Sequence, residues 1–536
     1  MTSVAKPFPR LLPLAFFLAV GAFAWWRVSD NTADNDLWGH VLYGQRMLAL
    51  GHVEKSDPFS WTAGGAPWLN HEVLAEAALG AAHRIAGGTG LWLLAVGAAA
   101  ATLGLALREA RRVVHEPGAG AAAAALLAVS TNAIALGFSA RPQLFTMFAL
   151  VVQLGLMRRL YAGRRWPLLA LPALSLVWIN THGGVLAGLL LLAVAAVATL
   201  LQRALPRGLT RLLVSAAPRR AAAWFAAALV LCAAAALVTP WGAASLRWLV
   251  ASVGYLRPEI TEWRPTPLDP AHALFWFTAA VSVVAWFLSR RERPAWEAAV
   301  LAVLLVMAAR HQRHLPLFGL ANLVLTPPHL LDLLRRLRPH AAGLVAAAES
   351  AAGRVVLSVL LLAGAAAALG ASVRAPRERP WSIEVERDQF PCAALRFLEE
   401  HPVDGNLLVF FDWGQQALWA LPRNPVSFDG RLDTVYSRAL IDAHWRFYRG
   451  EPVDPAVLDL ARAEVALLPT SGAAVPRLRA AGWTLVYTDP LASVLVRTAG
   501  LAPAGLARPV RGGPEAVRGR EPFPDAPSAR ARPDGS

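Results

Sequence analysis

Two aspartates lie two residues apart just after the first apolar run of the chain. The stretch Asn31-Thr-Ala-Asp34-Asn-Asp36-Leu-Trp-Gly-His40 contains both of them, with a histidine four residues beyond Asp36. Apolar side chains recur at helical spacing over 37–48, so we expect a helix there that lies on a membrane surface. One reading is that the acids cap this helix and favour its dipole. A single aspartate suffices for a cap, however, and two close carboxylates repel each other unless a divalent cation or a cationic partner lies nearby.

The same loop contains a second group of side chains that could do chemistry. His71 and Glu72 follow Asn70, which suits an N-cap position, and precede an apolar-periodic stretch over 73–85. Together with the aspartates and His40, they form a set of hard oxygen and imidazole ligands. The spacing matches no fixed metal motif, so these residues indicate a divalent cation such as Mg²⁺, Mn²⁺ or Zn²⁺ without selecting one.

Several polar or charged side chains interrupt the apolar runs further along. The run Arg310-His311-Gln312-Arg313-His314 places four possible cations beside an apolar segment. Long basic side chains can reach the membrane interface, which is one reading of this run. The other is that an anionic group such as a lipid phosphate or pyrophosphate binds nearby. Similar isolated polar groups, which are functional candidates at membrane depth, are Arg141, Asn180, His182 and the loop residue Glu262.

The composition of the chain points to membrane helices as the elements that position these residues. Of the 536 residues 56% are hydrophobic and only 16% are charged, whereas a soluble domain has about 25% charged residues. We therefore expect a polytopic α-helical membrane protein. About eleven transmembrane helices are predicted, at 11–28, 90–107, 121–138, 143–157, 166–180, 184–200, 221–239, 272–289, 295–309, 315–327 and 354–372.

The distribution of arginine predicts the orientation of these helices. The net charge is +15, which in a soluble protein would suggest nucleic acid, but here the basic residues gather in alternate loops between apolar runs. The arginine-rich loops are 108–112, 158–165, 203–220, 290–293 and 335–338. We expect them to be cytoplasmic, together with the N-terminus, in a bacterial-type inner membrane. No nucleic-acid partner is expected. The loop at 30–88 and the C-terminal region then lie outside the cytoplasm.

Three regions follow from these patterns. Residues 1–372 form the transmembrane domain, with the loop at 30–88 as its candidate catalytic segment. Residues 373–499 contain short buried-strand patterns, for example 406–411 and 465–468, a hairpin pattern at 483–497, and helical patterns between them, so we expect an extracytoplasmic α/β domain. Residues 500–536 are rich in Pro, Arg, Ala and Gly without periodicity and are expected to be disordered.

The acidic pair in the first non-cytoplasmic loop, the surface helix after it, about eleven spans and the C-terminal domain together resemble one group of enzymes. They are similar to the integral-membrane GT-C glycosyltransferases, including bacterial relatives of the protein mannosyltransferases and the lipid A aminoarabinose transferases. The resemblance covers roughly 10–372. Asp34 and Asp36 match the family's acidic pair, although its common form is Asp-Glu followed by an aromatic residue, whereas this chain has Asp-Asn-Asp-Leu-Trp.

The resemblance implies a polyprenyl-phosphate-linked sugar as donor, and a lipid, glycan or protein as acceptor. Asp36 is then the favoured base, with Asp34 and Glu72 as further catalytic candidates, because an inverting transfer needs a carboxylate to activate an acceptor hydroxyl. Positive charge must stabilise the leaving phosphate. The expected substrate-binding residues are Arg141, Asn180, His182, Glu262, Arg310, His311, Arg313 and His314. A metal would lie at Asp34 and His71, and these loops are expected to converge on one cavity at the outer membrane interface.

Two other classes of protein stay open on the sequence. A transporter would also use polar breaks such as the run Asn180-Thr-His-Gly-Gly184, but it should show repeat symmetry between its halves. A non-catalytic assembly or sensing protein would use the C-terminal domain as a binding module. In that case replacing the aspartates, His71 and Glu72 would leave function intact, while deleting 373–499 would abolish it.

Overall fold

The computed structural model describes residues 11–113, 118–204, 218–255, 257–341, 343, 348, 350–374, 379, 381–501, 503 and 508–526. The expectations for the N-terminal end at 1–10, for most of the arginine-rich loop at 203–220 and for the last part of the tail lie outside these residues. The chain divides into two compact units. We call Met1–Asp30 with Ala95–Ala375 the helical unit, and Asn31–Leu94 with Pro376–Ser536 the sheet unit.

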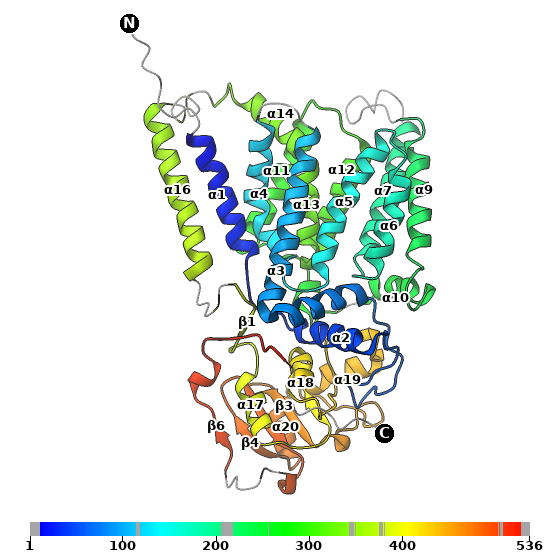
Figure 1. Cartoon of the computed structure of the whole chain (residues 1–536), viewed down its shortest axis with the longest axis vertical. Helices are drawn as coiled ribbons and strands as arrows, with labels where there is room; N and C mark the ends of the chain where they lie inside the picture. Colours follow the sequence, from blue (N-terminus) through cyan, green and yellow to red (C-terminus); the bar gives the residue numbers. More distant parts are fainter. Residues whose placement is uncertain are drawn as a thin grey trace. The chain divides into compact units, whose positions relative to one another are not determined.

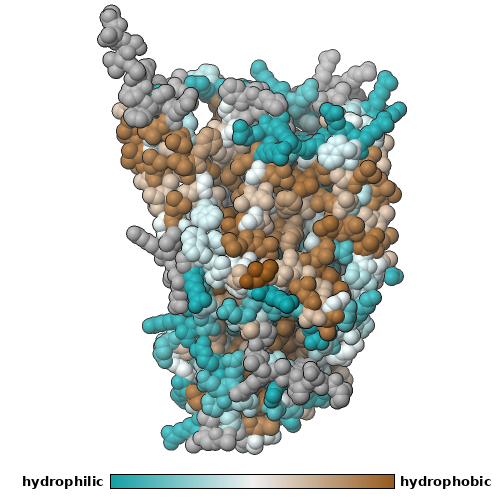
Figure 2. Space-filling model, in the orientation of Figure 1, coloured by the Kyte–Doolittle hydropathy of each residue, from teal (hydrophilic) through white to brown (hydrophobic). Residues whose placement is uncertain are grey.

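The helical unit is built mainly from apolar helices, most of which run beside one another (Figure 1). In chain order they are α1 Leu11–Val28, the second part of α3 Val73–Val113, α4 Ala119–Ala135, α5 Gln143–Tyr161, α6 Pro167–Ile179, α7 Val185–Ala204, α9 Ala221–Ala235, α10 Ala243–Val253, α11 Ala273–Leu288, α12 Ala295–Arg310, α13 Leu315–Leu325, α14 Pro327–Leu337 and α16 Ala351–Arg374. Figure 2 shows apolar side chains over much of the surface of these helices. Such a surface is stable in lipid rather than in water.

Each of the eleven predicted spans coincides with one of these helices, but the structure does not establish eleven crossings. Among the described residues, five helices are long and apolar enough to cross a membrane, and a sixth span results if the pair Gln312–Leu325 and Pro327–Leu337, bent by 63°, counts as one. Most of the other predicted spans are apolar helices of 10–17 residues. The helix α10 was not predicted and lies inside the expected loop at 240–271. The chain is thus a multi-pass membrane protein, and the count of eleven spans is not confirmed.

The sheet unit contains the first loop together with the C-terminal region. Its helices are α2 Leu37–Leu50, the first part of α3, α17 Cys392–Glu400, α18 Gly414–Ala420, α19 Arg438–Tyr448 and α20 Ala474–Ala480. Its strands are β1 Glu384–Glu386, β2 Leu407–Val409, β3 Val465–Pro469, β4 Thr484–Thr488, β5 Ala492–Val496, β6 Val510–Arg511 and β7 Arg520–Pro522. The predicted helix over 37–48 is confirmed. α3 breaks at Ala86 and Gly87, where Gly87 has φ 55°, between the predicted stretch 73–85 and the predicted span 90–107.

Five strands of this unit form one sheet in the order β2-β3-β5-β4-β6. β2 pairs with β3 in parallel, while β3, β5 and β4 pair antiparallel, and the predicted hairpin is β4 with β5. Every residue of β5 is buried, as is expected for a central strand covered on both faces. Aromatic residues from the first loop, such as Tyr43, Phe59 and Trp68, pack into the same core as the strands.

Two boundaries differ from the sequence prediction. The first loop was grouped with the transmembrane domain, but in the structure Asn31–Leu94 forms one compact unit with the C-terminal region. The reason is its aromatic side chains, which have a hydrophobic core to enter only beside the sheet. The disorder expected for 500–536 is wrong for 508–526, because β6 pairs with β4 and β7 pairs with β1. Pairing with strands far away in the sequence orders a segment whose composition has no periodicity.

Candidate active site

Asp36 occupies the N-cap position of α2, yet its carboxylate does not cap the helix. The backbone there has φ −86° and ψ −9°, and no side-chain capping hydrogen bond forms. Asp34 takes the local structural role instead, because its Oδ1 accepts the Asp36 N–H at 3.1 Å and its carbonyl accepts the Leu37 N–H at 3.1 Å. Asp34 therefore shapes the turn before α2, and helix capping does not account for the Asp36 carboxylate.

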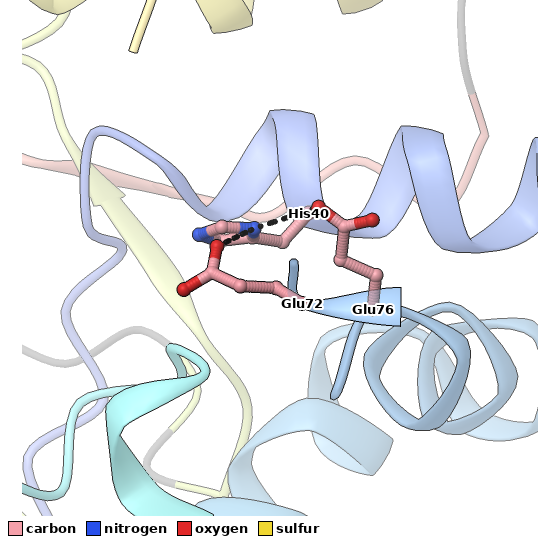
Figure 3. A group of neighbouring side chains, drawn as sticks. All are labelled: His40, Glu72 and Glu76. Carbon is pink, nitrogen blue, oxygen red and sulfur yellow. Dashed lines mark hydrogen bonds and ion pairs between the residues drawn. The ribbon is translucent and has the colours of Figure 1, made fainter. Parts of the chain in front are cut away.

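A histidine and two glutamates gather where α2 meets the start of α3 (Figure 3). His40 Nδ1 lies 3.3 Å from Glu76 Oε1 and 3.9 Å from Glu72 Oε2. His40 comes from the first turn of α2, Glu72 directly precedes α3, and Glu76 lies in the first turn of α3. The side chains of His40 and Glu76 are only 10% and 4% exposed. We call these three residues the His-Glu group.

Two glycines allow the helices to approach closely enough to form this group. A Cβ added to Gly44 would fall 1.9 Å from the Glu76 carbonyl oxygen, and one added to Gly80 would fall 2.7 Å from the Gln45 nitrogen. Backbones can meet at this distance only where neither residue has a side chain. His40 precedes Gly44 by four residues and Glu76 precedes Gly80 by four, so each polar side chain lies one helical turn before the contact.

Asn70 completes the surroundings of the His-Glu group. Its Oδ1 accepts the Glu72 N–H at 3.0 Å, and its Nδ2 donates to Glu76 Oε2 at 2.5 Å. Burial opposes protonation of His40, but the hydrogen bond with Glu76 and the charges of Glu72, Glu76 and Asp36 raise its pKa above the usual value. The group therefore favours a positive charge at its centre, either an imidazolium or a bound cation.

The donor set of the His-Glu group also suits a divalent metal. One imidazole and two carboxylates are ligands that Zn²⁺ and Mn²⁺ accept, and the three ligand atoms lie within 4.8 Å of one another. Among the described residues this is the only such group of three, and it does not contain the expected pair Asp34 and His71. His71 lies beside it, with Nε2 3.7 Å from Glu72 Oε1. Sequence reasoning missed Glu76, although its position four residues after Glu72 predicts a shared helix face.

An aspartate from the C-terminal region lies close to the acidic pair. Asp412 belongs to the short helix Phe411–Trp413, and the side chain of Asn35 hydrogen-bonds to it. Burial raises the pKa of Asp412, the hydrogen bond with Asn35 lowers it, and the charge of Asp34 raises it further. The sequence could not indicate that Asp412 and Asp34 interact, because they lie far apart in the chain.

A second buried ion group holds the turn after Phe428. Arg431 donates to Asp429 through Nε at 2.9 Å and Nη2 at 2.8 Å, and to Asp57 through Nη1 at 2.6 Å. The arginine side chain is 3% exposed and both carboxylates are fully buried. Tyr436 adds a hydrogen bond to Asp429 Oδ2 at 2.8 Å. This group joins the first loop to the C-terminal region.

The helical unit contains a separate cluster of charges around Glu262. Arg141 Nη1 lies 3.6 Å from one carboxylate oxygen of Glu262, and Arg313 Nη1 lies 3.7 Å from the other. Burial would raise the pKa of Glu262, but the charges of Arg141, Arg313, His182 and His314 lower it, so the carboxyl group is ionised at neutral pH. Two guanidinium groups against one carboxylate leave this Glu262 cluster with excess positive charge.

The remaining residues that the sequence singled out have other surroundings. His311 Nδ1 contacts the Trp263 carbonyl oxygen at 2.6 Å, and the Arg313 guanidinium stacks on the Trp263 ring at 4.2 Å. Trp263 therefore packs against the Glu262 cluster. Asn180 ends α6 and donates to the Leu176 and Val238 carbonyls, both at 2.9 Å. Arg310, the last residue of α12, is exposed. His182 accepts the Gly184 N–H at Nδ1, so a neutral ring carries its proton on Nε2.

No protein-family model and no curated protein matches this sequence. The structure is similar to that of the oligosaccharyltransferase from Archaeoglobus fulgidus in the apo form, with a TM-score of 0.55, 14% identity, and coverage of 94% of this chain and 76% of that one. AglB from the same organism, in complex with an inhibitory peptide and a dolichol-phosphate, gives a TM-score of 0.53 at 14% identity, covering 86% of this chain and 69% of that one.

ArnT from Cupriavidus metallidurans in the apo state gives a TM-score of 0.50 at 16% identity, covering 91% of this chain and 98% of that one. At these identities the likeness concerns the fold, and it extends over both the helical and the C-terminal parts of the chain. The chain therefore has the fold of the integral-membrane GT-C glycosyltransferases, the group that its sequence resembles.

Proposed function

We propose that this protein is a membrane glycosyltransferase that moves a sugar from a polyprenyl-phosphate-linked donor to an extracytoplasmic lipid, glycan or protein. The observation that carries the proposal is the place of Asp36 at the start of α2, close enough to His40 for its charge to act on the imidazole. The fold supports the reaction class, and the dolichol-phosphate bound to AglB supports a donor with a lipid phosphate. The protein would act in a bacterial-type inner membrane.

Asp36 is the base in this proposal. Its carboxylate takes the proton of an acceptor hydroxyl as the hydroxyl oxygen attacks the anomeric carbon of the sugar. The bond from that carbon to the phosphate oxygen breaks, and the polyprenyl phosphate leaves with the bonding electrons. Asp34 fixes the start of α2 through the Asp36 N–H, and Glu72 belongs to the neighbouring His-Glu group.

The Glu262 cluster supplies the positive charge for the leaving phosphate. Guanidinium groups bind phosphate oxygens through charge-assisted hydrogen bonds, and Arg141 and Arg313 both lie in this cluster. Both guanidinium groups lie at ion-pair distance from Glu262, at 3.6 and 3.7 Å.

Replacing Arg313 tests the phosphate-binding role. Because a hydrogen bond to a charged group contributes about 1.5–3 kcal/mol, Arg313→Gln is expected to raise the KM for the donor at least tenfold. Arg108→Gln serves as the control, since Arg108 is an exposed arginine of the same unit. The measurement is the initial rate of transfer as a function of donor concentration. An unchanged KM for Arg313→Gln would remove the Glu262 cluster from the proposal.

A divalent metal in the His-Glu group forms the second part of the proposal. His40, Glu72 and Glu76 would hold it, and a bound cation would supply positive charge that stabilises anionic oxygen atoms. We expect purified protein incubated with Zn²⁺ or Mn²⁺ and then desalted to retain about one ion per chain. Glu76→Gln should retain at least tenfold less metal, because one of the three ligands is lost. Glu400 is exposed, so Glu400→Gln should retain as much metal as the wild type.

Elemental analysis by mass spectrometry measures this directly and does not depend on activity. If the wild-type protein retains no ion, or if Glu76→Gln retains as much as the wild type, the group is an imidazolium held between two carboxylates. The pKa of His40, which its neighbours raise, is consistent with that arrangement when no metal is bound.

The direct test of the function is a transfer assay. Purified protein in detergent is mixed with a polyprenyl-phosphate-linked sugar and a panel of lipid, glycan and peptide acceptors, and the release of polyprenyl phosphate is followed by mass spectrometry. We expect release that increases with time and with protein concentration. A transporter or a non-catalytic assembly protein would leave the donor intact, and that result with a panel of donor sugars would overturn the proposal.

A further inference from the structure

Gly430, in the C-terminal region, lies directly against the carboxylate of Asp36. A Cβ added to Gly430 would fall 2.1 Å from Asp36 Oδ1 and 2.7 Å from Gln415 Nε2. Because both distances are measured from the same point, the carboxylate oxygen and the amide nitrogen are neighbours on one face of this glycine. Any side chain larger than hydrogen at 430 would occupy the place where these two groups meet.

Gln415 connects this place to the first turn of α2. Its Oε1 accepts the Gly39 N–H at 3.1 Å, and a Cβ added to Gly39 would fall 2.3 Å from the same oxygen. The Gln415 side chain is buried and comes from the start of α18. Gln415 therefore contacts α2 through its carbonyl oxygen, while its N–H₂ group faces Gly430 and the Asp36 carboxylate. Rotation of the amide would place a donor against the Gly39 N–H, so the amide has one favourable orientation.

The turn that carries Gly430 is held in a strained conformation. Leu432 has φ 43°, and among the described residues it is the only non-glycine with a positive φ. Asp429 and Arg431 fix the turn on one side through the buried ion group that includes Asp57. Thr434 fixes it on the other side, since its Oγ1 donates to the Arg431 carbonyl and its own carbonyl accepts the Leu69 N–H. Strain of this kind persists where the surroundings dictate it, and it often accompanies a functional site.

We infer that Gln415 and the Gly430 turn are positioning elements that hold the carboxylate of Asp36 in the orientation needed for proton transfer. This inference rests on the proposed function. A base must be held to within about 0.5 Å of its productive geometry, and groups packed around it provide that restraint. The C-terminal region thereby becomes part of the catalytic machinery rather than an appended binding module.

Gly430→Ala tests the inference. The added methyl group meets the far ends of the Asp36 and Gln415 side chains, which can move aside, so the fold should be retained while the carboxylate is displaced. We expect kcat to fall at least tenfold, with the KM for the donor and the unfolding temperature unchanged. The matched control is Gly500→Ala in the same unit, where an added Cβ has nothing within 4 Å. It should match the wild type in all three quantities.

Gln415→Glu provides a second variant if Gly430→Ala proves unstable. Glutamate has the same size and keeps an oxygen to accept the Gly39 N–H, but it replaces the N–H₂ group with a second carboxylate oxygen near Asp36. We expect kcat to fall at least tenfold, again with unchanged KM. A merely structural role would change the unfolding temperature and not kcat alone.

The outcomes separate this inference from the proposed function. If the wild-type protein transfers no sugar, the proposed function fails. If the wild-type protein is active and Asp36→Asn is inactive, but both positioning variants keep the wild-type kcat, then the positioning role is wrong and the base assignment stands. A loss of kcat in a stable Gly430→Ala or Gln415→Glu variant, with the Gly500→Ala control unchanged, supports it.

Discussion

Asp36→Asn is expected to lower kcat for sugar transfer by about 10²–10⁴-fold, the range that a positioned general base contributes. Asparagine has the same shape as aspartate, so the start of α2 and the contact with Gly430 should be retained. An amide cannot accept the proton of the acceptor hydroxyl, so the loss should appear in kcat rather than in the KM for the donor. Initial rates at saturating donor, compared with the wild-type enzyme, measure this effect.

Two control variants make the result specific. Asp404→Asn removes an exposed carboxylate of the same unit and should leave kcat unchanged. Asp34→Asn should reduce kcat less than Asp36→Asn, because an amide oxygen can still accept the Asp36 N–H. If Asp36→Asn retains wild-type turnover, the base is another residue. A larger loss for Asp34→Asn than for Asp36→Asn would exchange their roles.

Arg431→Met is expected to destabilise the sheet unit by about 3–5 kcal/mol, because removing one partner of a buried ion group leaves the others uncompensated. Asp57 and Asp429 are fully buried and both pair with this guanidinium. For a unit of this size the loss corresponds to a fall of roughly 10 °C in the unfolding temperature. Unfolding of the purified protein in detergent, followed by intrinsic tryptophan fluorescence, provides the measurement.

The matched control for this substitution is Arg423→Met, which removes an exposed arginine from the same unit. Its unfolding temperature should stay within about 2 °C of the wild type, as is usual for surface substitutions. Adding Asp57→Asn and Asp429→Asn to Arg431→Met should recover part of the loss, since the two carboxylates then no longer carry unpaired charge. Equal unfolding temperatures for the Arg431 and Arg423 variants would show that the buried ion group does not stabilise the fold.

The sequence predicted most elements of the fold because their patterns are local. The helix after the acidic pair, the start of α3 at Val73 and the hairpin of β4 with β5 all follow from the spacing of apolar side chains. The resemblance to GT-C glycosyltransferases came from the acidic pair, the helix after it, the number of apolar runs and the C-terminal domain, all of which are patterns of composition and spacing. The count of eleven spans is not confirmed, because an apolar helix of 10–17 residues has the same hydropathy whether it crosses a membrane or packs among other helices.

The composition of the candidate site was decided by contacts between distant residues. Asp34 and Asp36 were visible as a pair, but only tertiary structure shows that Asp34 makes the backbone hydrogen bond while Asp36 faces Gly430. Likewise, Glu76 joins His40 because Gly44 and Gly80 let two backbones meet.

The sequence by itself thus determined the membrane class, the acidic pair and the run of cations, since composition and short-range spacing specify them. Tertiary structure alone decided that the first loop shares a core with the C-terminal sheet, and that part of the tail forms strands. It also decided that Arg431 pairs with Asp57, which is 374 residues away in the chain. The physical reason is that burial and ion pairing depend on which segments pack together. These segments lie far apart in the sequence, and the periodicity of each one does not indicate its packing partner.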